Sequence, residues 1–240
     1  MSNMTIDNEL NKDYKKYLSH FQRLNRLTRE EYEQYAKSYG RDYDEFLPKD
    51  KSIRILDIGC GGGHFLYFLL KKGYYNVEGI DISPSQVLRC KQIVNAKVVV
   101  ADVFKFLPLR KKTYDVIVMN DFIEHFTKKQ IRTLLQLVYE SLKDGGKVII
   151  RTPNMASITG LRSRYMDLTH KTGFTEESLF QILEMSGFRD IIIKGISITG
   201  LKSKVSMFLM WLFVRLAYGA AGIHPPPRIL TANLLACASK

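Results

Sequence analysis

Residues 53–65, IRILDIGCGGGHF, decide the fold. The first six form an apolar run that is too short for a helix and rich in β-branched side chains, which predicts a buried strand. After Asp57, glycines occupy every second position: Gly59, Gly61 and Gly63. The apolar residues 65–70 then open a helix. A strand that passes through glycines into a helix brings bare backbone close to a ligand and aims the helix N-terminus at it.

The same alternation of strand and helix continues along the chain. Predicted strands lie at residues 53–58, 77–82, 97–101, 114–120, 147–152, 188–198 and 229–239. Predicted helices lie at residues 63–72, 84–95 and 175–187, with a further one running through Leu134 to Lys143. This order predicts an α/β fold, a Rossmann-like seven-stranded and mostly parallel sheet with helices on both faces. Ligands of such sheets bind at the carboxyl ends of the strands.

The 240 residues divide into an N-terminal helical cap, residues 1–50, and one domain, residues 51–240. Residues 5–47 look helical, and Thr28 with Glu31 forms a capping-box pattern. Three scattered cysteines suit a reducing cytoplasm, and no apolar leader segment opens the chain. The net charge is +12, and no acidic residue follows Asp190. That basic C-terminal part favours an anionic partner, such as a phosphate-bearing substrate, anionic lipid or nucleic acid, although a solubilising surface is the better explanation for any single lysine.

Two further carboxylates stand where strands end. Asp81 closes the second strand, 24 positions after Asp57, where a carboxylate accepts hydrogen bonds from ribose hydroxyls. Asp102, with Val103 beside it, follows the third strand, where it can take an adenine amino group. The spacing D-x-G-x-G-x-G differs from the G-x-G-x-x-G of dinucleotide-binding proteins.

With these motifs the sequence resembles the class I S-adenosylmethionine-dependent methyltransferases. The resemblance runs from about residue 30 to the C-terminus through LDIGCGGG, GIDIS, ADVF, NDFIEHF and DGGKVII. It implies an antiparallel last strand and a bound S-adenosylmethionine, converted to S-adenosylhomocysteine. The implied cofactor residues are Asp57, Gly59, Cys60, Gly61, Gly63, Asp81, Ile82, Asp102, Val103 and Asn120, with Asp121 beside Asn120 at the reaction site.

A hydroxyl acceptor needs a base, and the first candidate is His125. On a helix, Asp121, Glu124 and His125 would share one face. The run is similar to the E-x-x-E-H of ubiquinone-type O-methyltransferases, whose matching residues are implicated in binding a divalent cation. Here an aspartate replaces the first glutamate, so we favour a helix-steadying role for Glu124 and His125 and expect no resident metal.

The second candidate base is His170, in the irregular residues 153–173 that we predict to form the acceptor loop. Its D-x-T-H run, followed by F-T-x-x-x-L from Phe174, resembles methyltransferases of bacterial polysaccharide gene clusters. We assign Tyr165, Asp167 and Arg164 to the acceptor, and the basic side chains would suit a phosphate on it. The alternative is that His170 only anchors the loop.

Residues 205–222, VSMFLMWLFVRLAYGAAG, lie within a predicted apolar helical insertion, residues 203–224. Their length approaches that of a membrane span, but the last strand must rejoin the sheet. Two roles stay open for this stretch: a helix at the inner membrane surface, or a contact with protein, as a homodimer surface or a lid over the acceptor.

The expected function is therefore an S-adenosylmethionine-dependent methyltransferase, O-directed, acting on a saccharide or phosphate-bearing intermediate of capsule or other surface polysaccharide. The expected location is cytoplasmic or peripheral at the membrane. A quinone-like phenol is the alternative acceptor. Nucleic acid is not expected, because Asn120-Asp121-Phe122-Ile123 stands where base-amino methylators carry N-P-P-Y. A non-catalytic cofactor-binding scaffold is the remaining alternative.

Overall fold

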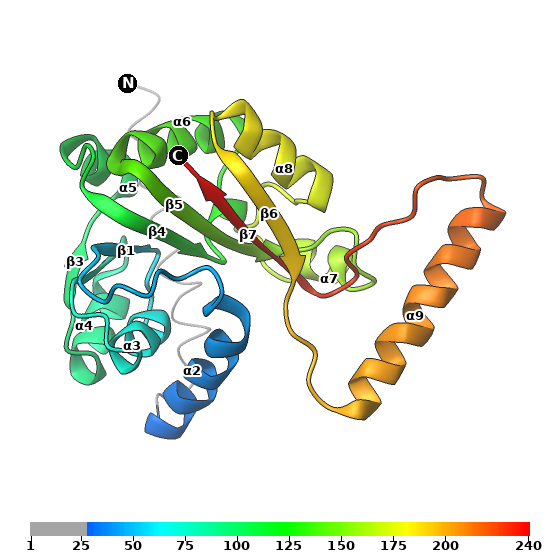
Figure 1. The fold of residues 1–240 in the computed structure, drawn as a ribbon, viewed down its shortest axis with the longest axis horizontal. Helices are drawn as coiled ribbons and strands as arrows, with labels where there is room; N and C mark the ends of the chain where they lie inside the picture. The colour runs from blue at the N-terminus through cyan, green and yellow to red at the C-terminus, as the bar shows by residue number, and fades with distance from the viewer. Residues whose placement is uncertain (1–27) are drawn as a thin grey trace.

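The computed structural model describes residues 28–240, and a seven-stranded sheet forms its centre (Figure 1). The strand order is β3-β2-β1-β4-β5-β7-β6, and only β7 runs antiparallel to its neighbours. The strands are β1 (Ile55–Ile58), β2 (Val77–Asp81), β3 (Lys97–Val100), β4 (Tyr114–Asn120), β5 (Leu142–Pro153), β6 (Arg189–Gly195) and β7 (Asn233–Ser239). The predicted fold class is confirmed. The part of the predicted first helix at residues 5–27 lies outside the described residues.

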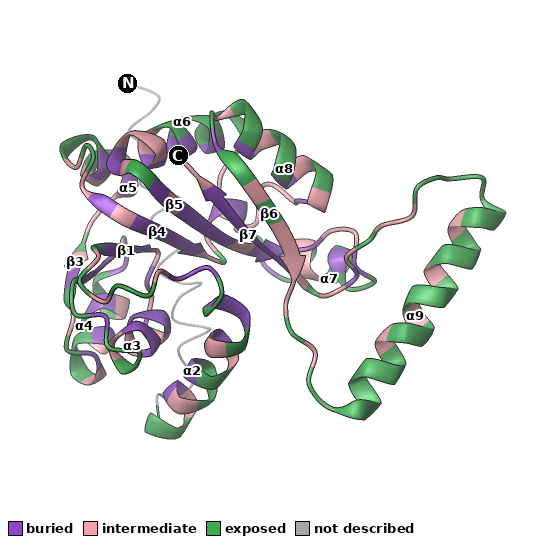
Figure 2. Ribbon diagram, viewed as in Figure 1, coloured by how far each residue is buried: buried purple, intermediate pink, exposed green. Residues whose placement is uncertain are grey.

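Helices cover both faces of the sheet. One layer holds α2 (Arg29–Tyr43), α3 (His64–Lys71) and α4 (Pro84–Ile93). The other holds α5 (Val103–Phe106), η1 (Leu107–Leu109), α6 (Lys128–Ser141) and α8 (Glu176–Met185). All four residues of β1 are buried, and Ile55 packs toward the first layer while Leu56 and Ile58 pack toward the second. Strand alternation therefore divides the core into two halves, one on each face of the sheet. The central strands between them are largely buried (Figure 2).

Local signals in the sequence explain where the helices begin. Ser83 caps α4, and Pro84 takes its first position. Thr28 accepts the Glu31 amide at the start of α2. Complete capping boxes open α6 and α8, at Thr127 and Thr175.

Three strand boundaries differ from the prediction by more than two residues. β5 begins at Leu142, because the glycine turn at Gly145 stays within the strand as an irregularity in its pairing with β4. β6 ends at Gly195. β7 begins only at Asn233, because the Asn154 side chain holds the carbonyls of Ile229 and Thr231 and takes that segment away from the ladder.

The remaining helices are η2 (Ile123–His125), α7 (Gly160–Tyr165) and α9 (Leu201–Ala220). α9 is formed by the apolar stretch and stands apart from the sheet on two connecting segments (Figure 1). Among the described residues, no helix combines the length and apolarity needed to cross a membrane.

Candidate active site

The turn between β1 and α3 has its glycines in the left-handed region, with φ of 72° at Gly59, 50° at Gly61 and 84° at Gly63. A Cβ at Gly59 would meet the Phe122 ring at 2.4 Å, and one at Gly63 would meet Cys90 Sγ at 2.3 Å. At Gly61 it would meet nothing within 4 Å among the described residues. Gly59 and Gly63 are therefore required by packing, whereas Gly61 exposes bare backbone to open space.

Asp81 joins this turn to the end of β2. One of its carboxylate oxygens accepts from the Gly61 amide at 2.9 Å, and the other accepts from the Ser83 amide at 2.8 Å. Burial raises the pKa of Asp81, and the two backbone amides oppose that rise. Ile82, the next residue, is about half exposed.

Asp57 lies beneath the turn and is 2% exposed. Burial raises the pKa of Asp57 to about 8, with a further contribution from Asp81 and an opposing one from Arg151. An uncompensated carboxylate at such a depth marks a place where a cationic group would be favourable.

Cys60 differs from the other predicted cofactor residues. Its side chain is buried, with Sγ 2.9 Å from the Cβ position of Gly79, so it faces the first helical layer. The backbone of Cys60 is also bonded within the turn, because its amide donates to the Ile80 carbonyl and its carbonyl accepts from the Gly63 amide.

Asp102 and Val103 lie beyond the end of β3, which stops at Val100. Asp102 is the N-cap of α5 and accepts the Phe104 amide at 2.9 Å. Val103 is buried in the second core half. Asp102 thus has a local structural role as well as its predicted place at the cofactor.

Asn120 is the last residue of β4, and its side chain is hydrogen-bonded by a residue of α2, outside the sheet. The Tyr43 hydroxyl of α2 donates to Asn120 Oδ1, while Asn120 Nδ2 is buried and has no hydrogen-bond partner in the described part of the chain. A buried amide donor without a partner is costly, so Nδ2 points to a ligand that accepts from it. Sequence reasoning had no signal for Tyr43, which lies 77 positions away.

The expected grouping of Asp121 with Glu124 and His125 on one helix face is wrong. Asp121 adopts φ of 49°, and η2 begins only at Ile123. Both carboxylate oxygens of Asp121 accept from Arg151, at the end of β5. Asp121 is thereby paired with a guanidinium instead of joining the other two residues.

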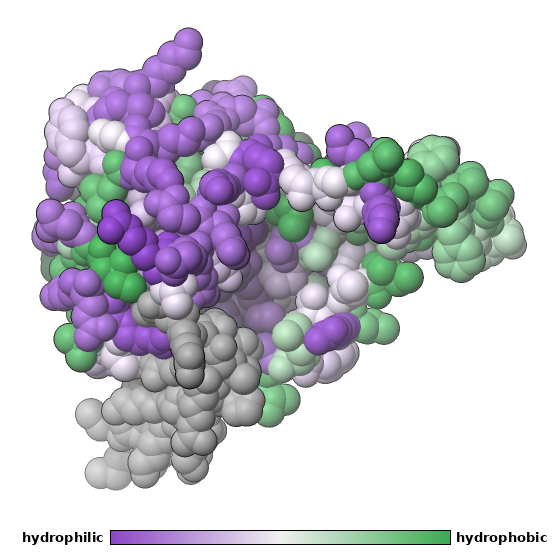
Figure 3. All heavy atoms as spheres, turned by 90° about the horizontal axis from the view of Figure 1, so that it is seen from below, coloured by the Kyte–Doolittle hydropathy of each residue, from purple (hydrophilic) through white to green (hydrophobic). Residues whose placement is uncertain are grey.

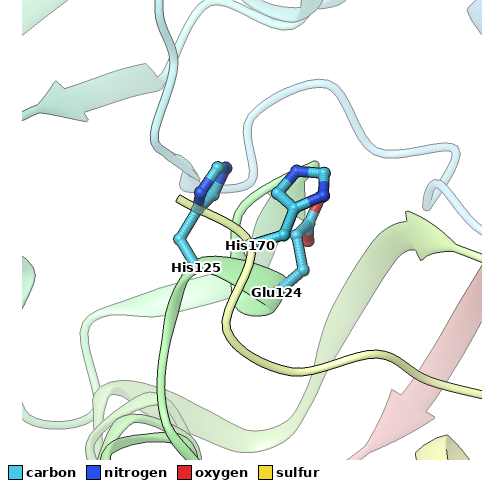
Figure 4. Close-up of side chains that lie close together, drawn as sticks. All are labelled: Glu124, His125 and His170. Atoms are coloured by element: carbon cyan, nitrogen blue, oxygen red, sulfur yellow. The ribbon is translucent and has the colours of Figure 1, made fainter. Parts of the chain in front are cut away.

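Glu124, His125 and His170 form the cluster that the structure brings together instead (Figure 4). One ligand atom from each lies within 4.8 Å of the others, and the two imidazole centroids are 4.9 Å apart. Glu124 is 2% exposed, its Oε2 accepts from Thr152 Oγ1 at 3.1 Å, and its Oε1 has no hydrogen-bond partner among residues 28–240. Burial raises the pKa of Glu124 to about 8, helped by the Asp121 charge.

The hydrogen bonds around the two histidines define which nitrogen is basic. His170 Nδ1 lies 2.8 Å from the Ser163 carbonyl, so Nδ1 carries the proton. The Thr169 hydroxyl donates to Asp167, so it accepts from His125 Nδ1 at 2.8 Å. Each neutral ring therefore keeps its basic lone pair on Nε2. Burial lowers the pKa of His125, and the neighbouring His170 lowers it further.

Of the three other residues assigned to the acceptor, two hold the acceptor loop in place and one is exposed to solvent. Asp167 is 5% exposed, accepts from Thr169, and lies 3.6 Å from His170 Nε2. The Arg164 guanidinium donates to the carbonyls of His170 and Lys171. Both therefore hold the loop in shape, whereas Tyr165 is 71% exposed.

A family model described as "Methyltransferase domain" matches residues 29–192. O-methyltransferase 3 of Dictyostelium discoideum is 24% identical over 68% of this chain and 43% of its own length. Phosphoethanolamine N-methyltransferase 1 of Zea mays is 29% identical over 63% of this chain and 31% of its own. The chain thus spans less than half the length of these curated relatives.

Among solved structures, a SAM-dependent methyltransferase from Archaeoglobus fulgidus is 27% identical, with a TM-score of 0.67 over 87% of this chain and 94% of its own. The residues matched by the family model, 29–192, include the glycine turn, Asp81 and the whole Glu124–His125–His170 cluster. The chain belongs to the methyltransferase domain family, in its class I S-adenosylmethionine-dependent group.

Proposed function

We propose that this protein transfers a methyl group from S-adenosylmethionine to an oxygen of a small polar acceptor. The observation that carries the proposal is the open space at Gly61, whose amide is bonded to the carboxylate of Asp81. Backbone with no side chain, aligned by the carboxylate that would accept the ribose hydroxyls, is what a nucleoside-bearing cofactor requires.

The residues present fit that cofactor. Asp57 supplies a buried carboxylate for its amino group, and Asn120 Nδ2 supplies an unused donor. Asp102 and Val103, near the end of β3, would border the adenine. When bound, S-adenosylmethionine supplies an electrophilic methyl group on sulfur; the protein's part is to align the acceptor and exclude water.

His170 and His125 are the bases that we assign to the acceptor hydroxyl. Each presents Nε2 as the basic nitrogen, and Asp167 Oδ2 lies 3.6 Å from His170 Nε2. A positioned base typically contributes about 10²- to 10⁴-fold to such a reaction. Glu124 beside them has a raised pKa and can hold a proton near neutral pH.

The acceptor class that we favour is a saccharide or phosphate-bearing intermediate of surface polysaccharide assembly. Tyr165 and the basic side chains of residues 153–173 would contact it. A second candidate is an amino group or a phenol of a small metabolite, because relatives at similar identity are named both O-methyltransferases and phosphoethanolamine N-methyltransferases. A divalent cation held by Glu124, His125 and His170 would be an alternative way to activate the acceptor.

Calorimetry tests the cofactor site. Asp81→Asn should weaken S-adenosylmethionine binding by at least about tenfold, because it removes a charge-assisted acceptor. Asp144→Asn is the matched control, since Asp144 is exposed on the turn within β5. Equal affinity in the wild type and Asp81→Asn would contradict the assignment.

Label transfer tests the acceptor. The protein is incubated with S-adenosylmethionine labelled in its methyl group and with a cell extract separated into sugar, lipid, phenol and nucleic-acid fractions. Label in the sugar or lipid-linked sugar fraction is expected, and loss of that label in His170→Ala would link it to this site. Label in the nucleic-acid fraction alone would overturn the proposed acceptor class.

A further inference from the structure

α9 is a twenty-residue helix in which no residue is buried. Its large apolar side chains are exposed to between 36% and 78%: Leu201, Val205, Phe208, Leu209, Trp211, Leu212, Phe213 and Leu216. The helix projects from the body, and its hydrophobic surface is visible as the arm in Figure 3. An exposed apolar patch of this size on a protein surface is typical of a site that contacts a membrane or another protein.

The exposed apolar side chains spread over about 200° of the helix circumference, more than one narrow stripe. At about 100° per residue, Trp211 and Phe213 lie roughly 160° apart around the axis. A second copy of the helix packed alongside would cover only one seam and leave the other side in water. Immersion in the interfacial layer of a bilayer covers both sides, and α9, about 30 Å long, would lie along that layer.

The charges on and beside α9 are complementary to an anionic surface. No acidic residue follows Asp190 in the sequence. Among residues 28–240, no carboxylate lies within 4 Å of the α9 cations Lys202, Lys204 and Arg215. Arg215 lies over the Trp211 ring, 4.6 Å from its centroid. Arginine and tryptophan together are typical of the headgroup level of membranes.

The acceptor loop exposes a second apolar group at the same edge of the sheet. β6 runs parallel to β5, so the segment leading to α9 leaves from the edge at which β5 opens into residues 153–173. Exposed there are Ile158, Leu161, Tyr165, Met166 and Leu168, the last at 95%. Asn154, just after β5, also holds the segment that returns from α9. Two elements thus present apolar side chains beside the candidate site.

We propose that α9, together with the exposed apolar residues of the acceptor loop, docks on the surface of an anionic phospholipid bilayer. The arrangement places the carboxyl edge of the sheet, and therefore the candidate active site, against the headgroups. An acceptor displayed at the membrane surface then reaches the site without leaving the membrane.

Tryptophan fluorescence gives a direct test, because Trp211 is the single tryptophan of the chain. Vesicles with equal parts of phosphatidylglycerol and phosphatidylcholine should shift its emission to shorter wavelength, and brominated lipid should quench it. The shift should be smaller with pure phosphatidylcholine and should weaken as salt is raised from about 0.05 M to about 0.5 M. An emission spectrum unchanged by anionic vesicles would overturn the proposal.

Matched variants identify the surface in a vesicle flotation assay. Phe208→Ser with Phe213→Ser should weaken binding by about tenfold or more, because two exposed rings lose their apolar burial. Lys202→Glu with Lys204→Glu should weaken binding to anionic vesicles alone. The controls Leu88→Ser with Leu109→Ser, and Lys91→Glu with Lys111→Glu, change exposed residues outside α9 and the acceptor loop and should bind as the wild type does.

Sedimentation equilibrium tests whether a second copy of the protein, instead of a membrane, covers the α9 surface. A dimer in buffer that Phe208→Ser with Phe213→Ser dissociates, without vesicle binding by the wild type, would assign α9 to a second copy and overturn the membrane proposal. Vesicle binding is measured without cofactor or acceptor, and cofactor binding without vesicles. The failure of one proposal is therefore distinguishable from the failure of the other.

Discussion

The burial of the Asp57 carboxylate predicts that cofactor binding is coupled to the release of a proton. Its pKa is raised to about 8 by desolvation and by Asp81 on β2, while Arg151 on β5 opposes the rise. At pH 7 the group is therefore mostly protonated in the free protein. Pairing with the cationic amino group of the cofactor favours the carboxylate, so binding should release up to one proton per site.

Calorimetry in buffers of different ionisation enthalpy measures that proton directly. The release should be largest between about pH 6 and pH 8 and small above pH 9, where Asp57 is already charged. Asp57→Asn should bind the cofactor more weakly and release no proton. A binding enthalpy that does not depend on the buffer at pH 7 would show that Asp57 does not change its charge.

Glu124 should make the stability of the protein depend on pH. Its pKa is raised from 4.5 to about 8 by burial. The folded state therefore favours the protonated group. Its contribution to stability is complete below the unfolded pKa and is lost as the pH rises toward 8.

Glu124→Gln should remove that part of the pH dependence, because the amide stays neutral and can still accept from Thr152. As the pH rises from 5 to 8, the unfolding free energy should fall in both proteins. The fall should be smaller in the variant than in the wild type, by at least about 1 kcal/mol. Urea titrations across this range measure the difference. The exposed Glu140→Gln is the control and should follow the wild type.

At the scale of elements, the turn between β1 and α3 separates a glycine needed for folding from one needed for binding. Gly61→Ala should cost about 1–2 kcal/mol of stability, the price of a left-handed conformation, because its Cβ meets nothing. It should nevertheless weaken cofactor binding by about tenfold or more, because the methyl group enters the cradle.

Gly63→Ala is the contrasting substitution in the same turn. Its Cβ would lie 2.3 Å from Cys90 Sγ and 3.0 Å from Val94, so the variant should unfold at lower urea or express poorly. Thermal melts and calorimetry on both variants distinguish the two effects. Unchanged cofactor affinity in a folded Gly61→Ala would place the cofactor elsewhere.

At the scale of the whole molecule, α9 is predicted to be dispensable for folding. Gly195 of β6 already pairs with Leu234 of β7, and α9 contributes no buried residue. Replacing residues 201–224 by a Gly-Ser linker of about ten residues should change the Tm by less than about 2 °C. Ser197 and residues 229–231 are retained because they contact Asp42 and Asn154.

A differential scanning experiment measures this Tm, with cofactor binding as the second readout. Both should match those of the wild type, while vesicle binding is lost. A fall of more than about 5 °C would show that α9 stabilises the sheet after all.

The sequence by itself determined the features that arise from local pattern. The apolar strand of residues 53–58, its glycines, the helix caps and the alternation of elements are all set by neighbours a few positions apart. Because parallel strands end at one edge, the positions of Gly61 and Asp81 at a common site followed as well. Periodicity located these elements, but not the strand ends that a side chain such as Asn154 decides.

Only the tertiary structure decided which chemical groups meet. His170 reaches Glu124 and His125 because a loop 45 positions away folds onto η2, held there by Arg164 and by the bond between Thr169 and His125. Asp121 does not join the grouping predicted for it, because its carboxylate pairs with the guanidinium of Arg151 on the neighbouring strand β5. Such contacts depend on packing between distant segments, which no local spacing encodes.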